Sequence, residues 1–419
     1  SFGHRQRKRL SKQGFKQLQQ KHSDVKMTPL IERMKNNLVL SEMRQRLVNT
    51  LKNHPVRNLS RGFNKGIGFL LPLPGGYSGG IHSVVQEATA MAKLGVRVHI
   101  LVPFQHCHCY LELYPDAYHL GLFRCVRFPD IKQYASDYDV LVATIASSMR
   151  WACHVRDDFP QLAIGYYIQD YEPFFYQPGS SQWQEAVDSY ESVDDCIAFA
   201  KTDWIANMVY ERHGLPVFKV QASIDHSVYK LDETFDFEDF SVIRVTAMIR
   251  PSTPRRGAER SMRVLRRLKM IFGQLLEIQV FGCEDNDTHW DVLETDFDFV
   301  NHGVLNQKGV RGLLQSSHLF IDLSDYQAFG RTAVEAMACG CVPVVTVNGG
   351  VNEFIEPGIN GFVVNVFSEN ETVQTLRDLM DVPQRLSKCR NQAIVTASRY
   401  TPIQAALSEI NLLYDHVKK

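Results

Sequence analysis

The sequence predicts an α/β protein with two domains, each built on a doubly wound parallel sheet. Its 419 residues are too many for one typical hydrophobic core. Short apolar segments alternate with helical patterns in both halves, which is typical of parallel sheets covered by helices. Glycine-containing turns join a predicted strand to a predicted helix in each half. Together these features favour two domains of the same class that follow one another along the chain.

The first half begins with a βαβ unit. A strand over 66–73, a glycine-rich turn over 74–80, a helix over 81–94 and a strand over 95–102 imply a right-handed parallel crossover. Further strands are expected over 139–144, 163–168, 195–199 and 218–222, and helices over 148–155, 183–192 and 202–214. The first sheet is therefore predicted to contain about six strands.

The second half repeats the alternation after an acidic and aromatic segment at 232–239, which we interpret as the interdomain linker. Strands are expected over 242–249, 276–281, 297–302, 318–323 and 342–347, and helices over 257–271, 309–316, 331–338, 371–380, 384–398 and 402–417. The predicted domains are a basic helical extension (1–62), two α/β domains (63–235 and 236–400) and a C-terminal helix (401–419).

The formal net charge of zero hides a strong asymmetry. Residues 1–65 hold 16 Lys and Arg against 3 Asp and Glu, and the remainder holds 30 against 43. A basic arm on an acidic body predicts contact with an anionic partner, such as a membrane surface, or with another part of a larger polypeptide. Its amphipathic pattern from residue 27 to about 55 could equally cover the protein's own core or bind a partner helix. The acidic body and the lack of a binding motif argue against nucleic acid.

The nine cysteines favour reduced thiols in the cytoplasm over a disulfide framework, since the number is odd and several lie in apolar segments. The His-Cys-His-Cys run at 106–109 has adjacent ligands, whereas structural zinc sites use pairs spaced by two to four residues. The acidic run at 284–287 is better explained as an exposed loop than as a Mg²⁺ site. No metal or other cofactor is therefore expected. No apolar run approaches the ~20 residues of a membrane span.

Two features mark the ligand-binding edge of the first sheet. Gly79 and Gly80 open a predicted helix, where a glycine turn either receives a phosphate or only makes the turn. Asp170 and Glu172 follow a buried strand, at the edge where open α/β sheets bind ligands. They are candidates for hydroxyl recognition, with helix capping or loop hydrogen bonding as the alternative.

Three arginines follow the first strand of the second half: Arg250, Arg255 and Arg256. One guanidinium can donate two parallel hydrogen bonds to two phosphate oxygens. Three such groups at the carboxyl edge of a strand therefore predict a phosphate site. Such a loop could neutralise a diphosphate leaving group.

The stretch from 322 to 361 contains a second candidate phosphate-binding site. Phe329 and Gly330 precede a helix, whose first backbone N–H groups and dipole favour an anion. One turn later, the Glu335 carboxylate could reach a ribose hydroxyl. On these residues alone, an ordinary α/β unit with a tight packing turn is the favoured interpretation.

The second half resembles glycosyltransferase family 4, which has the GT-B fold. The family's pattern EGFGxxxxEAMAxGxPV, followed by GGxxExIxxGxNG, is matched at positions 329, 330, 335–338, 340, 343, 349, 350, 353, 358, 360 and 361. The resemblance covers about residues 63–419. It implies two Rossmann-like domains facing across a cleft, with the last helix crossing back to the first domain.

The resemblance also implies roles for residues of this chain. The donor-binding set is Gly79, Gly80, Arg250, Arg255, Arg256, Gly282, Ala328, Phe329, Gly330, Arg331, Thr332 and Glu335. Within it, the arginines correspond to the family's Arg and Lys on the diphosphate, and Glu335 to the ribose-binding glutamate. The candidate catalytic residues are Asp170, Gln327 and Arg250.

Two positions depart from the family pattern. Gln327, eight residues before Glu335, stands where the family has its first glutamate. An amide can hydrogen-bond sugar hydroxyls, but it adds no negative charge near a developing oxocarbenium ion. Gln169 precedes Asp170 where many members have histidine. These differences weaken the analogy with glucose- or mannose-type donors.

The predicted activity is transfer of a hexosyl or deoxyhexosyl group from a UDP-, GDP- or dTDP-sugar to a glycan or lipid-linked glycan of a cell-surface polysaccharide. The resemblance implies retention of configuration without a metal ion. The cysteines and the basic arm predict a cytoplasmic protein that is peripheral to the membrane. The phrases YYIQDYEPFFYQPG and RPSTPRRG resemble a bacterial subgroup that includes rhamnosyltransferases. The alternatives are another GT-B activity, such as a nucleotide-sugar epimerase or a phosphorylase, and a degenerate nucleotide- or glycan-binding module of a larger synthase.

Overall fold

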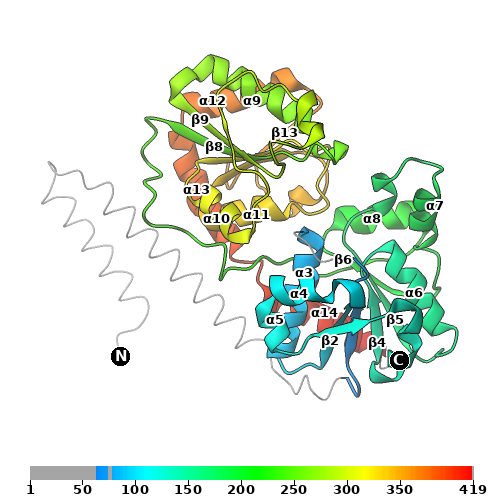
Figure 1. Ribbon diagram of the computed structural model, residues 1–419. Coiled ribbons are helices and arrows are strands. Elements are labelled where there is room, and N and C mark those ends of the chain that lie inside the picture. The colour runs from blue at the N-terminus through cyan, green and yellow to red at the C-terminus, as the bar shows by residue number, and fades with distance from the viewer. Residues whose placement is uncertain (1–62, 74–77, 418–419) are drawn as a thin grey trace, which may run out of the picture. The chain divides into compact units, whose positions relative to one another are not determined.

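The computed structural model describes residues 63–73 and 78–417 and contains two parallel sheets (Figure 1). The strand orders are β3-β2-β1-β4-β5-β6-β7 and β10-β9-β8-β11-β12-β13. In both sheets the order reverses beside the first strand, as in doubly wound folds that bind ligands at this point. The predicted α/β class and the two parallel sheets are confirmed, and both sheets lie in one compact unit.

The first sheet consists of β1 (Ile67–Leu70), β2 (Val98–Pro103), β3 (Phe123–Val126), β4 (Val140–Ala143), β5 (Ala163–Ile168), β6 (Ile197–Ala200) and β7 (Phe218–Lys219). Its helices are α3 (Gly79–Lys93), α4 (Cys107–Leu113), α5 (Pro115–His119), α6 (Ala146–Arg156), α7 (Ser181–Asp188) and α8 (Asp203–His213), with the 3-10 turns η2 (Phe104–His106), η3 (Phe128–Asp137) and η4 (Glu172–Phe175).

The second sheet consists of β8 (Ile243–Met248), β9 (Leu276–Phe281), β10 (Val300–Asn301), β11 (Leu319–Asp322), β12 (Val342–Thr346) and β13 (Phe362–Val364). The helices that follow or connect these strands are α9 (Ala258–Phe272), α10 (Gln307–Gln315), α11 (Arg331–Cys339), α12 (Glu369–Asp381), α13 (Gln384–Ala397) and α14 (Pro402–Val417), with the 3-10 turns η5 (Pro254–Arg256), η6 (Gly273–Leu275), η7 (Thr288–Val292) and η8 (Gly350–Glu353).

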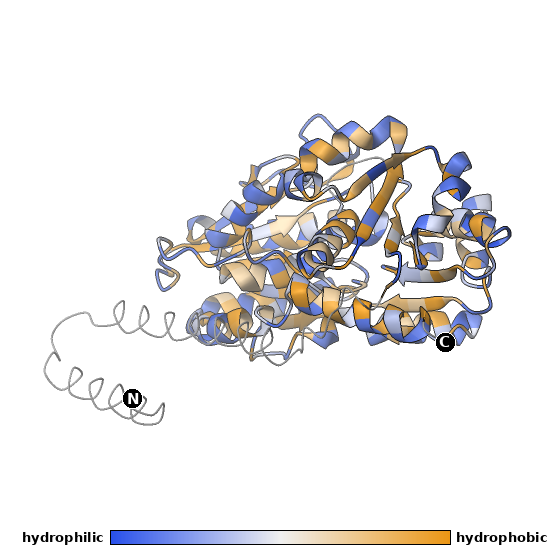
Figure 2. Cartoon of the chain, turned by 90° about the horizontal axis from the view of Figure 1, so that it is seen from below, coloured by the Kyte–Doolittle hydropathy of each residue, from blue (hydrophilic) through white to orange (hydrophobic). Residues whose placement is uncertain are grey.

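Each sheet has a hydrophobic core on both faces. In the second domain, α9 and α12 cover one face, and α10, α11 and α13 cover the other (Figure 1). The central strands are fully buried and apolar, whereas the helices carry polar residues on their outer sides (Figure 2). This two-sided burial explains why the strands read as continuous apolar runs in the sequence.

Three features of the first domain differ from the sequence prediction. Its sheet has seven strands, not about six, because the edge strand β3 (FRCV) is mostly half-buried and lacks an apolar signal. The short helices α4 and α5 were also not predicted. The expectation of reduced thiols is wrong at one pair, since Cys107 and Cys125 form a disulfide between α4 and β3. The other cysteines of the described residues are free.

The segment 232–239 contains no helix or strand and leads from β7 to β8. Its Phe237 is buried in the core of the second domain, where it packs beside His318. The segment is therefore attached to the second domain by the packing of Phe237, and its acidic residues flank this phenylalanine in the sequence.

The C-terminal helix α14 packs against the first domain. Its buried residues Ala406, Ile410 and Leu413 belong to the same core as β1, β2 and α3. On the same helix, the fully buried Glu409 accepts a hydrogen bond from Lys201, which follows β6. A buried charge is tolerated only with a partner, so this pair fixes where α14 lies on the sheet.

The predicted basic extension, residues 1–62, lies outside the described residues, as does part of the glycine-rich turn at 74–77. No helix of the described residues combines the length and apolarity needed to cross a membrane.

Substitution of Leu413 tests the packing of α14. Leu413 is fully buried, and its Cδ2 lies over Gly165 of β5. We expect Leu413→Ala to lower the free energy of unfolding by about 3 kcal/mol, because it removes buried methyl groups and leaves a cavity. Urea unfolding followed by circular dichroism measures the change. The control Leu275→Ala, at a side chain 61% exposed, should change stability by less than about 0.5 kcal/mol. Equal effects would contradict the packing described.

Candidate active site

A cavity of about 440 Å³ opens at the carboxyl ends of both sheets. The first domain contributes the start of α3, the loops after β4 and β5, and Lys201 after β6. The second domain contributes the loop after β8, the end of β11 and the first turn of α11. Both walls are therefore made where doubly wound sheets bind their ligands. Every predicted site residue lines this cavity except Gly282.

The arginine loop (residues 250–256) is the most positively charged part of the wall. Arg255 Nη2 forms an ion pair with Asp170 Oδ2 at 3.1 Å, and its guanidinium lies 4.8 Å and 5.2 Å from the ring centroids of Phe175 and Tyr326. Its Nε and Nη1 are buried without hydrogen-bond partners among the described residues. Two donors on one clamped guanidinium therefore remain available for an anion.

Arg250 and Arg256 share this loop and line the same cavity. Burial lowers the pKa of Arg250, and the nearby charge of Arg255 lowers it further. Burial also lowers the pKa of Arg256, against the attraction of Asp322. Both guanidinium groups remain charged, because arginine titrates far above neutral pH. An anion that enters the cavity would relieve the electrostatic cost of their burial.

Gln327 connects the arginine loop to β11. Its Oε1 accepts from Arg256 Nη1 at 2.9 Å, and its Nε2 donates to Asp322 Oδ2 at 2.6 Å and to Ser324 Oγ at 3.0 Å. Both polar atoms of this amide, which the sequence suggested could meet sugar hydroxyls, have protein partners in this structure. The side chain of Asp322 lies 3.9 Å from Arg256.

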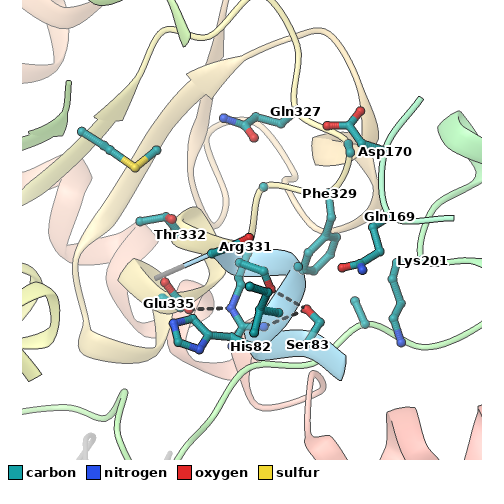
Figure 3. A pocket seen from close by; sticks show the side chains of 18 of the residues that line it. His82, Ser83, Gln169, Asp170, Lys201, Gln327, Phe329, Arg331, Thr332 and Glu335 are labelled. Carbon is teal, nitrogen blue, oxygen red and sulfur yellow. Dashed lines mark hydrogen bonds and ion pairs between the residues drawn. The ribbon is translucent and has the colours of Figure 1, made fainter. Parts of the chain in front are cut away.

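Arg331 is the first residue of α11 and reaches across to α3 (Figure 3). Its Nε donates to Glu335 at 2.8 Å, and its terminal nitrogens donate to Ser83 and Gln86, both at 2.9 Å. Burial raises the pKa of Glu335, and Arg331 counteracts this. The carboxylate predicted to bind ribose is therefore held by Arg331 in this structure.

Gly330 is the N-cap of α11, and its φ of +96° places it in the left-handed region. No side chain caps this helix end. Ala328, Phe329, Gly330 and Thr332 line the cavity beside it. The N–H groups of this turn and the positive end of the helix dipole thus lie at the cavity wall.

The predicted glycines occupy different places. Gly79 and Gly80 are the first residues of α3, not part of a turn before it. A Cβ on Gly80 would lie 2.7 Å from Gln169 Oε1, so glycine permits close approach there. Gly282 lies after β9 with a φ of +112°, and a Cβ would meet the carbonyl oxygen of Ile249 at 2.9 Å. Gly282 therefore supports the base of the arginine loop without lining the cavity.

Asp170 and Glu172 have separate roles in the structure. Asp170 pairs with Arg255 across the cavity. Burial raises the pKa of Asp170, and the charge of Arg255 lowers it. Glu172 accepts the backbone N–H of Ala146, the first residue of α6, at 3.1 Å. Burial raises the pKa of Glu172 to about 7, although this hydrogen bond favours the ionised form. Helix capping, one of the two alternatives considered for this pair, therefore applies to Glu172.

The other polar motifs lie outside the cavity. In the run at 106–109, Cys107 is in the disulfide, and His108 pairs with Glu112. In the acidic run, Glu284 accepts from the backbone N–H of Val304, and Asp287 caps η7. The described residues contain no group of three His, Cys, Asp or Glu side chains placed to hold a metal ion.

Sequence reasoning missed several polar residues of the cavity: His82, Ser83, Lys201, Ser223, Tyr229 and Asp322. Asp322 could have been found, because it is the last residue of a buried strand, where ligand-binding side chains gather. His82 and Ser83 follow Gly80 within the first turn of α3. Lys201 and Ser223 are brought in by tertiary packing and carry no local signal.

Residues 298–396 match the family described as Glycosyl transferases group 1. This segment contains β11, α11 and β12, and so the helix end and Glu335 of the cavity. All of the matched residues lie in the second domain.

The curated relatives match the chain over a short segment. Sucrose synthase 4 of Oryza sativa subsp. japonica is 39% identical over 62 residues, which are 15% of this chain and 8% of that protein. Sucrose synthase 6 of Arabidopsis thaliana is 32% identical over 89 residues, 21% of this chain and 9% of that protein. The matching segments span less than a tenth of these relatives.

Solved structures match nearly the whole chain. The crystal structure of HepE from Anabaena in complex with UDP-glucose superposes with a TM-score of 0.67 at 16% identity, over 82% of this chain and 98% of HepE. Sucrose-phosphate synthase from Thermosynechococcus elongatus superposes with a TM-score of 0.62 at 13% identity, over 83% and 98% of the two chains. The fold is GT-B, as predicted.

The titration of Glu172 gives a test of the burial of the cavity wall. A carboxyl whose pKa rises from 4.5 to about 7 on folding binds a proton in the folded state that the unfolded chain releases. Its contribution to the free energy of unfolding therefore falls as pH rises from about 5 to about 7. Glu172→Gln removes this titration. We expect the stability of the native chain relative to Glu172→Gln, measured by urea unfolding, to decrease over that range. A difference independent of pH would contradict the raised pKa.

Proposed function

We propose that the chain is a glycosyltransferase that moves a hexosyl or deoxyhexosyl group from a nucleoside-diphosphate sugar to a growing cell-surface polysaccharide. The observation that carries this proposal is the arginine loop at the cavity. Arg255 has two buried donors without partners, and Arg250 and Arg256 lie beside it. A diphosphate supplies the charge and the oxygen atoms that this arrangement lacks.

The dimensions and surroundings of the cavity support this substrate class. Its volume of about 440 Å³ is within the usual range for small-molecule sites. The uncapped end of α11 adds backbone N–H groups to the arginine charge. The family match covers this helix, and the structurally similar HepE was crystallised with UDP-glucose.

In the proposed reaction, the bond between the anomeric carbon and the diphosphate oxygen breaks. The arginine loop and the α11 terminus stabilise the negative charge that develops on the leaving diphosphate. The acceptor hydroxyl oxygen bonds to the anomeric carbon on the same face, and its proton passes to the leaving phosphate oxygen. The reaction thereby retains the anomeric configuration. We include no metal ion, since three arginines supply the positive charge.

Contacts between the two domains serve to exclude water from this step. Thr202 donates to the carbonyl oxygen of Ala328 at 2.9 Å, and Arg331 joins α11 to α3. Closing the site in this way limits hydrolysis of the donor and strengthens electrostatic interactions inside it. The same Arg331 contact holds Glu335, which we propose to bind the ribose after the donor has rearranged this pair.

The donor classes that we propose are UDP-, GDP- and dTDP-sugars, with a rhamnosyl group as one candidate. The acceptor is proposed to be a glycan or a lipid-linked glycan. A purified chain incubated with a panel of these donors and glycan acceptors should release free nucleoside diphosphate with at least one donor. Donor binding without transfer or hydrolysis on any acceptor would instead support a binding module of a larger synthase. Acceptor-independent conversion of the nucleotide-sugar would indicate an epimerase.

Substitution of Arg250 tests the diphosphate site. We expect Arg250→Ala to weaken binding of the preferred nucleotide-sugar by about 2 kcal/mol, because it removes a charge-assisted contact with phosphate. Isothermal titration calorimetry measures the affinity directly, after a thermal-shift panel has selected the donor.

The matched control for that substitution is Arg267→Ala, which removes a guanidinium of α9 that does not line the cavity. It should leave donor affinity unchanged. Equal affinities for the native chain and Arg250→Ala would rule out the proposed diphosphate site.

Deletion of residues 1–60 tests the proposed membrane contact of the basic arm. Its excess of Lys and Arg should attract anionic lipid headgroups, with an energy that falls as salt rises. We expect the deletion to lower co-sedimentation with vesicles containing phosphatidylglycerol and to leave transfer to soluble acceptors intact. Equal co-sedimentation of the two chains would remove the membrane role.

A further inference from the structure

The side chain of Gln327 lies between a cation and an anion. Arg256 can only donate hydrogen bonds, and an ionised Asp322 can only accept them. An amide satisfies both, since it presents an acceptor to Arg256 at 2.9 Å and a donor to Asp322 at 2.6 Å. The second N–H of the amide donates to Ser324 Oγ at 3.0 Å. Only one orientation of the amide fits these neighbours.

The position of Gln327 is also fixed through its backbone. Its N–H donates to the carbonyl oxygen of Asn348 at 3.2 Å, and its carbonyl oxygen accepts from Gly350 at 2.7 Å. Gly349 has a φ of +103°, and a Cβ there would lie 2.0 Å from the Gln327 carbonyl oxygen. Only 5% of the residue is exposed. Gln327 therefore has little freedom to turn toward a ligand in the cavity.

Asp322 is held as firmly as Gln327. Its Oδ1 accepts from the backbone N–H of Ser324 at 3.0 Å and from the Ser324 hydroxyl, and its Oδ2 accepts from Gln327. It is the last residue of β11 and lines the cavity. The negative charge that Gln327 does not carry is thus present five residues earlier in the chain.

We propose that Gln327 is a positioning residue, which orients Arg256 toward the donor diphosphate, and that Asp322 is the anion on which this orientation depends. The hydrogen-bonded series Asp322–Gln327–Arg256 holds the guanidinium of Arg256 through its Nη1, and Arg256 lines the cavity. This inference rests on the proposed function, because it assigns Arg256 to the diphosphate. It also explains a glutamine here: a glutamate would place a second carboxylate against Asp322.

Three variants separate positioning from direct contact. Gln327→Glu places two carboxylates side by side. Asp322→Asn removes the anion. The double variant Gln327→Glu/Asp322→Asn exchanges the two groups, so that the new carboxylate accepts both from Arg256 and from the asparagine amide introduced in place of Asp322. The net charge of the double variant equals that of the native chain, and its hydrogen-bond chain is complete.

Inorganic pyrophosphate is the probe, because it tests the arginine loop whatever the base or sugar of the donor. We expect each single variant to bind pyrophosphate about tenfold more weakly in calorimetry, and the double variant to recover to within about threefold of native. Gln307→Glu, which adds the same charge to the wall of the same cavity, controls for general repulsion of the probe. Thermal melting of all variants shows whether they fold.

The pH profile gives a readout that a purely structural role would not affect. In Gln327→Glu the two carboxylates should share one proton as pH falls, and a protonated Glu presents the same donor and acceptor as the native amide. The ratio of its Kd to the native Kd should therefore approach one as pH falls from about 8 to about 5.5, while the double variant shows no such trend. The other charged groups that face Arg256 are Arg250, Arg255 and Asp170, and they are unchanged in all variants.

The outcomes distinguish this inference from the function on which it rests. Loss in both single variants, rescue by the exchange and recovery at low pH support it. If the native chain binds pyrophosphate but the exchange does not rescue, or if Gln327→Glu binds like native at about pH 8, the positioning role is wrong and the diphosphate site stands. Failure of the native chain to bind pyrophosphate would overturn the diphosphate site itself, and this inference with it.

Discussion

Buried positive charge determines the arrangement of the cavity. Arg250, Arg255 and Arg256 lie on one loop with their side chains largely removed from water, and Arg331 lines the same cavity. A buried guanidinium is costly unless an anion accompanies it. Asp170, Asp322 and Glu335 supply three carboxylates, and each contacts or approaches one of these arginines. Two donors of Arg255 are still left over, and an anionic ligand is the simplest partner for them.

The fold of the two domains brings these charged side chains to one cavity. The two sheets are wound in the same order, so that their carboxyl ends bring loops from distant parts of the chain to one cavity. The C-terminal helix α14 is built into the first domain, where Glu409 pairs with Lys201, itself a residue of the cavity wall. Arg331 then ties the first turn of α11 to α3. Hydrogen bonds of Arg331 and Thr202 thus join the walls of the site, together with the ring of Tyr326, which packs against Trp204 and Phe174.

The sequence predicted the sheets better than it predicted the side-chain partners. Strand β5, residues Ala163–Ile168, and helix α14, Pro402–Val417, have the predicted bounds, because burial on both faces or a proline at the first position leaves a strong local signal. The half-polar edge strand β3 left none. The arginine loop could be predicted because charge after a buried strand is unusual. The partners of Gln327 could not be predicted, since a missing glutamate in the sequence does not show that Asp322 supplies the charge 2.6 Å away.

The central claim is that the arginine loop receives the diphosphate of a nucleotide-sugar. A crystal structure of the chain with a bound nucleotide-sugar or nucleoside diphosphate tests it most directly. The account predicts phosphate oxygens within hydrogen-bond distance of Arg255 Nε or Nη1 and of Arg250, the nucleotide against the first turn of α11, and Gln327 still bonded to Arg256 and Asp322. A diphosphate bound elsewhere, with the donors of Arg255 unoccupied, would contradict it.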